Sequence, residues 1–202
     1  MMVTFKEINT FHRYYPFVED LLHSAFPADE RRDDELQREY TDSNDNFHCV
    51  LIQKPGKPVG LLTYWHFDTF VYVEHFAISE ELRRGGLGMQ AISHFTSSIN
   101  LPEVHEVEMP RIKGDITHRR IAFCRRAGFT LRKMAYRQPP YREGDEWLPM
   151  KLMTYGNFKW LKMADAIRDT IYREVYGVEA IGINSKAKKS TYLNIFQNKD
   201  FN

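Results

Sequence analysis

The stretch VEHFAISEELRRGGLG, residues 73–88, decides how the rest of the chain is interpreted. It begins as an apolar strand, continues through a short charged segment and ends in three glycines at the start of an apolar helical pattern. Glycines at such a turn let backbone N–H groups converge on an anion, and the positive end of the helix dipole adds attraction. With Arg83 and Arg84 supplying charge, the segment predicts a cradle for a pyrophosphate, approached closely at Gly86 and Gly88.

Other phosphate-binding loops fit the same residues less well. The pattern Gly-x-x-x-x-Gly-Lys-Ser/Thr does not occur in the sequence, and the dinucleotide fingerprint Gly-x-Gly-x-x-Gly would open the first strand–helix unit. The simpler alternative is a tight strand-to-helix turn whose glycines serve only its geometry. The two arginines and the strand–helix context favour the anion site over that alternative.

Composition limits the classes of protein to consider. The 202 residues are 43% hydrophobic and 14% aromatic, which suits one globular domain with a tail. The formal net charge of +1 gives no support for a nucleic-acid partner. Two cysteines, no secretory leader and no apolar run of ~18 residues predict a reduced, cytoplasmic protein without disulfides or a membrane partner. No metal is expected.

Apolar periodicity predicts a chain of alternating strands and helices. The order is β-α-α-β-β-β-α-β-α-β-β, in which the hairpins imply antiparallel pairing and the strand–helix–strand middle implies parallel pairing. The predicted fold class is therefore α/β, with a mixed, centrally parallel twisted sheet and helices on both faces. The predicted strands are residues 3–8, 47–53, 59–67, 71–78, 104–109, 129–136 and 147–155, and the predicted helices are residues 14–26, 29–40, 87–99 and 116–127.

The character of the sequence changes towards its C-terminal part. We expect a main domain over residues 1–155, an amphipathic helix within residues 156–178 and a polar extension over residues 179–202. An apolar stripe through Trp160, Ile167 and Val175 supports the helix. This helix either covers the sheet of its own subunit or docks on a partner chain, and the stripe does not distinguish the two.

The glycine loop resembles the acetyl-CoA signature of the GNAT superfamily, Gln/Arg-x-x-Gly-x-Gly/Ala, at Arg83, Gly86 and Gly88. The run RIAFCRRAGF, residues 120–129, resembles a later helix of the same family. The resemblance implies that residues 1–155 form a GNAT acetyltransferase domain, with the GNAT-like acyl-CoA N-acyltransferase fold and acetyl-CoA as co-substrate. It also implies contacts with CoA from Phe76, Ala77, Ile78, Arg83, Arg84, Gly85, Gly86, Leu87, Gly88, Met89 and Phe123.

The reaction implied by this resemblance moves an acetyl group from acetyl-CoA to a primary amine of a small molecule or peptide by direct attack. Two alternatives stay open: a catalytically weak module that binds or senses an acyl-CoA, and a transferase that uses another acyl donor. Residues 26–32, 139–141 and 148–153 resemble a bacterial branch of unassigned substrate. The family resemblance is also compatible with a homodimer.

A proton acceptor is needed because an amine attacks only in its neutral form. Strand alternation predicts that Glu74 and His75 cannot both face the acceptor. In GNAT enzymes an acidic residue on this strand often serves as base, so the resemblance favours Glu74, with a structural ion pair as the alternative. For His75 a hydrogen-bonded core position is the simpler interpretation, and Glu106 and Glu108 are reserve candidates. The predicted faces are Tyr72, Glu74, Phe76 and Ile78 on one side and Val73, His75 and Ala77 on the other.

Cys124 occupies the position where the resemblance implies a tyrosine that protonates the departing CoA thiolate. A thiol with an ordinary pKa of ~8.5 could take that role, whereas a small buried cysteine more often serves packing. A nucleophilic role would need an adjacent base, and His118 lies on the same predicted helix.

The acceptor is expected across the sheet from CoA, between the first two helices and the loop before the last strand. Glu30, Arg31 and Tyr141 are the candidate substrate-binding residues, although exposed helix charge is the simpler interpretation of the first two. An aromatic cleft with acidic groups would suit a small cationic amine, while a protein N-terminus or a lysine stays equally open.

Overall fold

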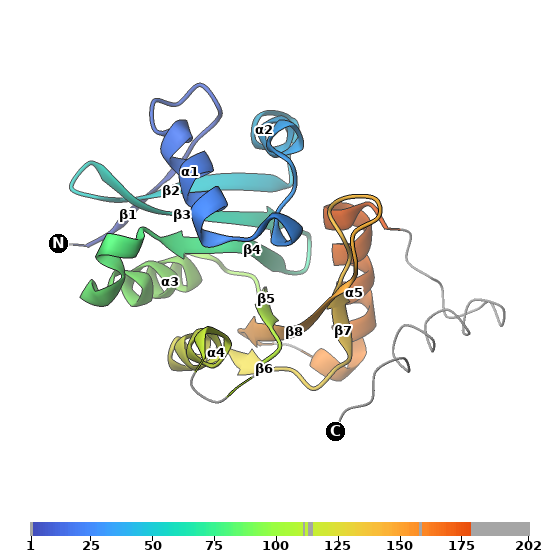
Figure 1. Cartoon of the computed structure of the whole chain (residues 1–202). Helices are drawn as coiled ribbons and strands as arrows, with labels where there is room; N and C mark the ends of the chain where they lie inside the picture. Colours follow the sequence, from blue (N-terminus) through green and yellow to red (C-terminus); the bar gives the residue numbers. More distant parts are fainter. Residues whose placement is uncertain (1, 111, 113–114, 158, 179–202) are drawn as a thin grey trace. The chain divides into compact units, whose positions relative to one another are not determined.

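The computed structural model describes residues 2–110, 112, 115–157 and 159–178. Helices and strands follow one another in nearly the predicted order (Figure 1). The strands are β1 (Thr4–Glu7), β2 (Phe47–Lys54), β3 (Lys57–His66), β4 (Val71–Ile78), β5 (Glu103–Glu108), β6 (Thr130–Leu131), β7 (Tyr136–Gln138) and β8 (Leu148–Tyr155). The α-helices are α1 (Tyr15–Ala25), α2 (Asp34–Ser43), α3 (Leu87–Ser98), α4 (Ile116–Arg126) and α5 (Trp160–Tyr176), and the 3₁₀ helices are η1 (Ala28–Glu30) and η2 (Glu80–Gly85).

The eight strands form a single sheet in the order β1-β2-β3-β4-β5-β8-β6, with β7 also paired to β8. β4 and β5 run parallel. The other strand pairs in the described part of the chain are antiparallel. The structure therefore confirms a mixed α/β sheet with parallel pairing at its centre.

Helices cover both faces of this sheet, as two adjacent residues of β3 show. Tyr64 packs against Phe95 of α3, with ring centroids 5.2 Å apart. Its neighbour Trp65 packs against Tyr40 of α2, with ring centroids 5.4 Å apart. Because successive side chains of a strand point to opposite faces, α2 and α3 lie on opposite sides of the sheet.

The second predicted helix, over residues 29–40, has wrong boundaries. Ala28–Glu30 form the separate turn η1, and α2 begins only after Asp33. The Asp33 carboxylate accepts a hydrogen bond from the backbone N–H of Leu36 at 2.8 Å. This side chain satisfies an N–H that the start of a helix leaves unpaired, so it fixes where α2 begins. The helix continues to Ser43, three residues beyond its predicted end.

The single strand predicted over residues 129–136 is also wrong, because two short strands occupy this segment. Both pair with β8, at Leu131 opposite Met153 and at Tyr136 opposite Met150. Five residue steps from Leu131 to Tyr136 thus lie opposite only three steps of β8, from Met153 to Met150. The residues between Leu131 and Tyr136 therefore cannot all pair with β8. Pairing with β8 therefore divides the segment into β6 and β7, and the apolar pattern of the sequence does not indicate this division.

A β-bulge in β4 changes which of its residues face α3. Thr63 of β3 pairs with His75, and the next residue of β3 pairs with Val73, so Glu74 is an extra residue on β4. Alternation changes phase there, because Val73 before the bulge and Ile78 after it both pack in the cluster with α3. The predicted faces, with Tyr72, Glu74, Phe76 and Ile78 opposite Val73, His75 and Ala77, are therefore wrong.

The central strands β4 and β5 separate after three paired residues. Their parallel ladder joins residues 71–73 to residues 103–105, although β4 continues to Ile78 and β5 to Glu108. On its other edge β5 pairs with β8 along its whole length, from Glu103 to Glu108. The two strands form a V whose apex lies at Val73 and His105. This opening in the middle of the sheet positions the candidate site.

Helix α5 is 17 residues long and lies within residues 156–178, where an amphipathic helix is predicted. Its stripe residues Ile167, Ile171 and Val175 are buried. The chain divides into compact units of residues 1–163 and 164–202, and the expected domain borders at residues 155 and 178 stay predictions. The predicted extension over residues 179–202 lies outside the described residues. None of the described helices is long and apolar enough to cross a bilayer.

Candidate active site

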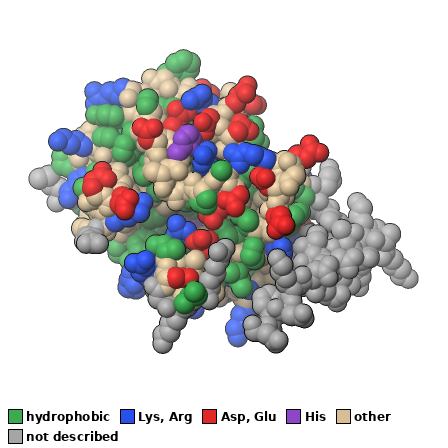
Figure 2. Space-filling model, viewed as in Figure 1, with side chains coloured by type: hydrophobic (Ala, Val, Ile, Leu, Met, Phe, Trp, Pro, Cys, Tyr) green, Lys and Arg blue, Asp and Glu red, His purple; other side chains and the backbone are tan. Residues whose placement is uncertain are grey.

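The V between β4 and β5 opens into a cleft of about 580 Å³. Residues of α4 line the cleft, as do residues of the segment between α1 and α2, and both central strands contribute to its walls. Aliphatic and aromatic walls alternate with charged groups, among them Glu30, Arg83, Arg119 and Arg120. Figure 2 shows the same mixture on one face of the molecule, where acidic and basic side chains are interspersed among hydrophobic ones.

The predicted glycine loop joins η2 to α3 and presents bare backbone. Gly86 adopts the left-handed conformation, with φ of 72°, which side chains other than glycine rarely adopt. A Cβ added at Gly85 or Gly86 would meet nothing within 4 Å, so this backbone is open to a ligand. The side chain of Leu87 is buried in the core, which leaves its backbone N–H, in the first turn of α3, as the group it can offer an anion.

A second recess beside this loop is lined by Arg83, Gly86, Gly88, Met89, Phe123 and Arg126. Arg83 Nε donates a hydrogen bond to the backbone carbonyl of Ile78 at 2.9 Å, which ties the loop to the end of β4. Arg126, at the end of α4, was not singled out from the sequence, where it is one of several arginines. The side chain of Arg84 lies outside the described part of the structure.

The predicted CoA-contacting strand residues Phe76, Ala77 and Ile78 line the cleft on its β4 side. Phe76 and Phe123 of α4 are nearly parallel, with ring centroids 6.2 Å apart. A Cβ on Gly88 would lie 3.5 Å from Phe123 and 3.8 Å from Ile78, so the missing side chain leaves space between these two walls. The structure brings the strand, the loop and α4 together as the sequence predicts, while their contacts with CoA stay predictions.

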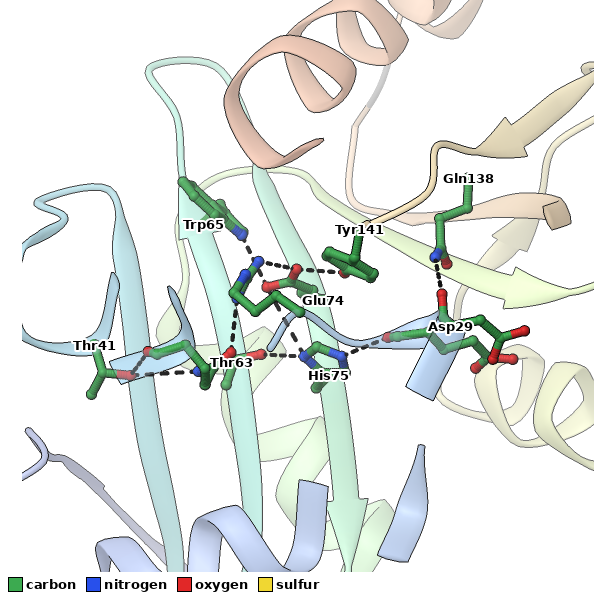
Figure 3. A network of polar contacts seen from close by, with 11 residues as sticks. Asp29, Thr41, Thr63, Trp65, Glu74, His75, Gln138 and Tyr141 are labelled. Atoms are coloured by element: carbon green, nitrogen blue, oxygen red, sulfur yellow. Dashed lines mark hydrogen bonds and ion pairs between the residues drawn. The ribbon is translucent and has the colours of Figure 1, made fainter. Parts of the chain in front are cut away.

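Glu74 lies at the centre of a buried polar network (Figure 3). Its side chain is 1% exposed and forms an ion pair with Arg32. The carboxylate also accepts hydrogen bonds from the indole N–H of Trp65 at 3.1 Å and from the hydroxyl of Tyr141 at 2.6 Å. Three donors from three separate segments therefore converge on this one side chain.

These contacts weigh against Glu74 as a proton acceptor. Burial raises the pKa of the Glu74 carboxyl, but the charge of Arg32 and the hydrogen bonds of Tyr141 and Trp65 outweigh it and hold this pKa below its ordinary value. A carboxylate that is stabilised in this way takes up a proton reluctantly. Its assignment as the catalytic base stays a prediction, and the contacts match the structural ion pair named as its alternative.

Arg32 is another residue of the site that sequence reasoning missed. It is 2% exposed, and it donates a hydrogen bond to Gln37 at 2.9 Å in addition to pairing with Glu74. Its guanidinium carbon lies 4.9 to 5.7 Å from the ring centroids of Tyr40, Phe47, Trp65 and Tyr141. Its neighbours in sequence are charged, and no local signal separates it from them.

His75 lies on the same side of β4 as Glu74, contrary to the prediction that the two point apart. Its Nδ1 is 4.0 Å from the Glu74 carboxylate and 3.1 Å from the hydroxyl of Thr63, and its Nε2 is 3.1 Å from the backbone carbonyl of Glu30. The bulge at Glu74 places both side chains toward η1. Burial lowers the pKa of His75, so this imidazole serves as a neutral hydrogen-bonding group of the core.

The end of β7 and the residues that follow it close the cleft against η1. Gln138 is buried and donates a hydrogen bond to the backbone carbonyl of Asp29 at 3.3 Å. Tyr141 reaches Glu74 from the same segment, and burial raises its pKa well above the ordinary value, so its hydroxyl keeps the proton that it donates. Residues more than 60 positions apart in sequence thus form the same wall.

Two of the three predicted acceptor residues lie at the cleft. Glu30 and Tyr141 line it, whereas Arg31 is turned toward Asp34, with 3.5 Å between the charged groups, and lies outside the lining. The reserve candidates on β5 also line the cleft. Glu106 accepts a hydrogen bond from the hydroxyl of Tyr136, and Glu108 forms an ion pair with Arg120.

Cys124 lies in the wall of the cleft and is 9% exposed. It packs with Val107, Ile121 and Phe129, and burial raises the pKa of its thiol to about 11. The thiol is therefore protonated at neutral pH, which suits a proton donor or a packing role better than a nucleophile. His118 forms its contact with Asp115 at 3.4 Å and is 41% exposed.

A model of the acetyltransferase (GNAT) family matches residues 15–129, which include the glycine loop, both central strands and α4. The chain belongs to the GNAT family. It is accordingly an acyltransferase. A comparison with curated proteins gives no match.

One solved GNAT structure is similar to this chain in both sequence and fold, and two more are similar in fold alone. A Bacteroides thetaiotaomicron protein, provisionally described as a GNAT-family acetyltransferase, is 45% identical, with a TM-score of 0.84, and the match covers 87% of this chain and 99% of that one. An Elizabethkingia anophelis GNAT acetyltransferase with acetyl-CoA bound is 16% identical, with a TM-score of 0.53 and coverages of 77% and 98%. A Bacillus subtilis acetyltransferase in complex with CoA is 13% identical, also with a TM-score of 0.53, and coverages of 77% and 99%. The last two show the shared fold.

The residues at the glycine loop fit the acetyl-CoA that GNAT acetyltransferases use. The open backbone at Gly85 and Gly86 and the recess with Arg83 and Arg126 suit a pyrophosphate. The gap beside Gly88 leads from that recess into the cleft. Among the described residues, no cluster of three or more His, Cys, Asp or Glu side chains is arranged to hold a metal ion.

Proposed function

We propose that this GNAT protein transfers the acetyl group of acetyl-CoA directly to a primary amine of a small molecule or peptide. The observation that carries the proposal is the separation of β4 and β5 after residues 73 and 105. In a continuous sheet the backbone would seal the centre. Here a cleft passes between the two central strands and is lined from both faces.

This geometry supports direct attack, because the two substrates can approach each other from opposite sides of the sheet. The side with α3 and α4 carries the glycine loop, and the opposite side carries η1 and Tyr141. The amine nitrogen forms a bond to the thioester carbonyl carbon, the carbon–sulfur bond breaks, and the CoA sulfur leaves toward α4. No covalent enzyme intermediate is needed, in keeping with the protonated thiol of Cys124.

The charge of the acceptor side supports a cationic amine as the incoming molecule. Glu30 and Glu106 both contribute to the lining, beside the aromatic rings of Phe26 and Tyr141. Carboxylates raise the local concentration of an ammonium ion, and aromatic faces attract a cation. A small amine, a peptide N-terminus and a lysine side chain all carry this group.

The proposal is tested by the release of CoA thiol from acetyl-CoA in the presence of a panel of amines. The panel contains a diamine, an arylethylamine, free lysine, a peptide with a free N-terminus and an N-terminally blocked peptide with one lysine. The N-acetylated form of each compound is its control. We expect at least one amine to raise thiol release about 100-fold over its control, with mass spectrometry locating the acetyl group on nitrogen.

The same assay separates the two alternatives. A protein that binds acetyl-CoA in calorimetry but releases no thiol with any amine would be an acyl-CoA-binding module. A protein that reacts much faster with propionyl-CoA or succinyl-CoA than with acetyl-CoA would use another donor. Either result would replace the acetyltransferase proposal.

A further inference from the structure

A buried histidine–glutamate pair lies at the apex of the V, and the sequence pattern did not single it out. Glu103 is 0% exposed and His105 7% exposed. Their closest atoms, His105 Nε2 and Glu103 Oε2, are 3.4 Å apart. His105 lines the cleft, and its backbone pairs with Val73 at the last step of the β4–β5 ladder. The ring therefore lies where the two strands begin to separate.

The charge environment of Glu103 differs from that of Glu74. The carboxylate of Glu74 is compensated by Arg32, whereas the ion-pair partner of Glu103 within the described residues is His105. The second carboxylate oxygen, Oε1, is buried and has no hydrogen-bond partner in the described part of the chain. The buried Glu103 carboxylate therefore meets the imidazole at Nε2 and fixes the orientation of the ring in the cleft wall.

The other groups near His105 include an aromatic ring and side chains of α4. Its ring packs on Phe129 with centroids 4.3 Å apart. Cys124 of α4 and Tyr155 of β8 pack with the same Phe129 ring, and Glu74 of β4 is paired with Arg32. Helix α4 also brings Arg119 and Arg120 to the cleft lining, and Arg120 is paired with Glu108.

We propose that His105, held by Glu103, is the proton-transfer group of the acetyl transfer. The inference rests on the proposed function. When the amine nitrogen bonds to the thioester carbon, its proton moves to His105 Nδ1 while Nε2–H points to the Glu103 carboxylate. As the carbon–sulfur bond breaks, the imidazolium returns this proton to the CoA sulfur. His105 ends the cycle neutral, and the products are the amide and CoA thiol.

The position of the pair fits this role. Ile78, beside the glycine loop, and Val73 at the apex lie opposite Gly60 and Tyr64 of β3, because Glu74 is an extra residue on β4. Four steps along β3 separate these two positions, which is about 14 Å along an extended strand. An extended thioester arm that starts at the loop and follows β4 therefore ends near His105. His105 is the catalytic residue in this account, and Glu103 is a positioning residue because it acts through the ring.

The kinetic test compares His105→Gln with His48→Gln, using the amine that reacts fastest in the panel. His48 is a matched control because it also contacts a glutamate, Glu7, at 2.7 Å, but lies on β2 outside the cleft lining. We expect His105→Gln to lower kcat about 100-fold or more, with the calorimetric Kd for acetyl-CoA changed less than twofold. His48→Gln should keep the wild-type kcat.

Two further measurements keep the inference open to refutation if His105→Gln folds poorly. In Glu103→Gln the kcat should fall while the KM for acetyl-CoA changes less than twofold, and Glu103→Asp, which keeps the carboxylate, should recover part of the lost kcat. In nitrogen-15 NMR spectra the Nε2 signal of the His105 ring should differ between wild type and Glu103→Gln, because Nε2 loses its carboxylate partner. An unchanged kcat in folded His105→Gln, a Glu103→Gln variant with wild-type kcat, or a ring signal that is identical in wild type and Glu103→Gln would overturn the role of His105. A wild-type protein that acetylates no amine would overturn the proposed function itself.

Discussion

Replacing Arg32 by methionine would remove the cation at the centre of the buried network while keeping much of its volume. The change leaves the Glu74 carboxylate, 1% exposed, with only the hydrogen bonds of Trp65 and Tyr141. Breaking a buried ion pair by removing one partner costs about 3 to 5 kcal/mol, because a buried charge is left uncompensated. In a protein of this size each kcal/mol shifts Tm by about 2 to 4 °C, so we expect a loss of about 6 to 20 °C.

The pH dependence of this loss identifies its cause. In the wild type the lowered pKa of Glu74 contributes stability above the unfolded pKa of ~4.3, and that stability disappears as pH falls through the lower folded value. Without Arg32, only the hydrogen bonds of Trp65 and Tyr141 oppose burial, so we expect burial, the largest of these effects, to raise the pKa of the carboxyl. The folded variant then holds its proton more tightly than the unfolded chain, so its stability falls as pH rises. The deficit relative to wild type should be largest near pH 7 and smaller near pH 5.

Urea unfolding of wild type, Arg32→Met, Glu74→Gln and the double variant at both pH values measures these terms. The double variant has neither buried charge, so it should be more stable than the sum of the single losses predicts, by about 2 kcal/mol or more. The reasoning would be refuted if Arg32→Met cost less than about 1 kcal/mol, or if the two single losses simply added. It would also fail if the deficit grew on acidification.

Three further outcomes are expected from single positions in the cleft and its supporting sheet. Gly86→Asp and Gly86→Asn form a matched pair, because aspartate and asparagine both tolerate the left-handed conformation of this position. At about 6 Å from a phosphate, the charge of the aspartate should weaken acetyl-CoA binding by about 0.7 to 3 kcal/mol more than the neutral asparagine does. Equal Kd values for the two variants in calorimetry would remove the pyrophosphate assignment. Cys124, with a thiol pKa of about 11, should react with iodoacetamide very slowly at pH 7 and faster as pH rises toward 11. If Cys124 protonates the leaving thiolate, Cys124→Ala should slow single-turnover acetyl transfer and Cys124→Ser should not. Identical rates in the two variants and the wild type would leave Cys124 a packing residue. Gly60→Ala would place a Cβ 2.5 Å from the carbonyl oxygen of Ala77 and 2.8 Å from Ile78. This overlap should displace β4, which borders the cleft, and lower the free energy of unfolding in urea by about 1 to 3 kcal/mol. A variant as stable as wild type would show that β4 shifts at little cost in free energy.

Local patterns in the sequence were sufficient for the order of elements and for the CoA side of the cleft. The glycine loop, the strand before it and α4 are each recognisable from adjacent residues, because a left-handed turn, an apolar strand and a helix end leave signals within a few positions. The glycine predicted to let the backbone approach an anion, Gly86, adopts a left-handed conformation, and Phe123 and Cys124 line the cleft. The family follows from the same segments.

The acceptor side and the proton-handling groups were decided by tertiary structure. One extra residue at Glu74 reverses the faces of β4, and only its register against β3 shows this. Arg32 and Tyr141 meet Glu74 from 42 and 67 positions away, and the burial of Glu103 beside His105 depends on the strands on either side of β5. The identity of a charged residue in the sequence does not show whether its side chain is solvated or buried. Its partner, and therefore its affinity for a proton, is set by which distant segments the sheet brings together.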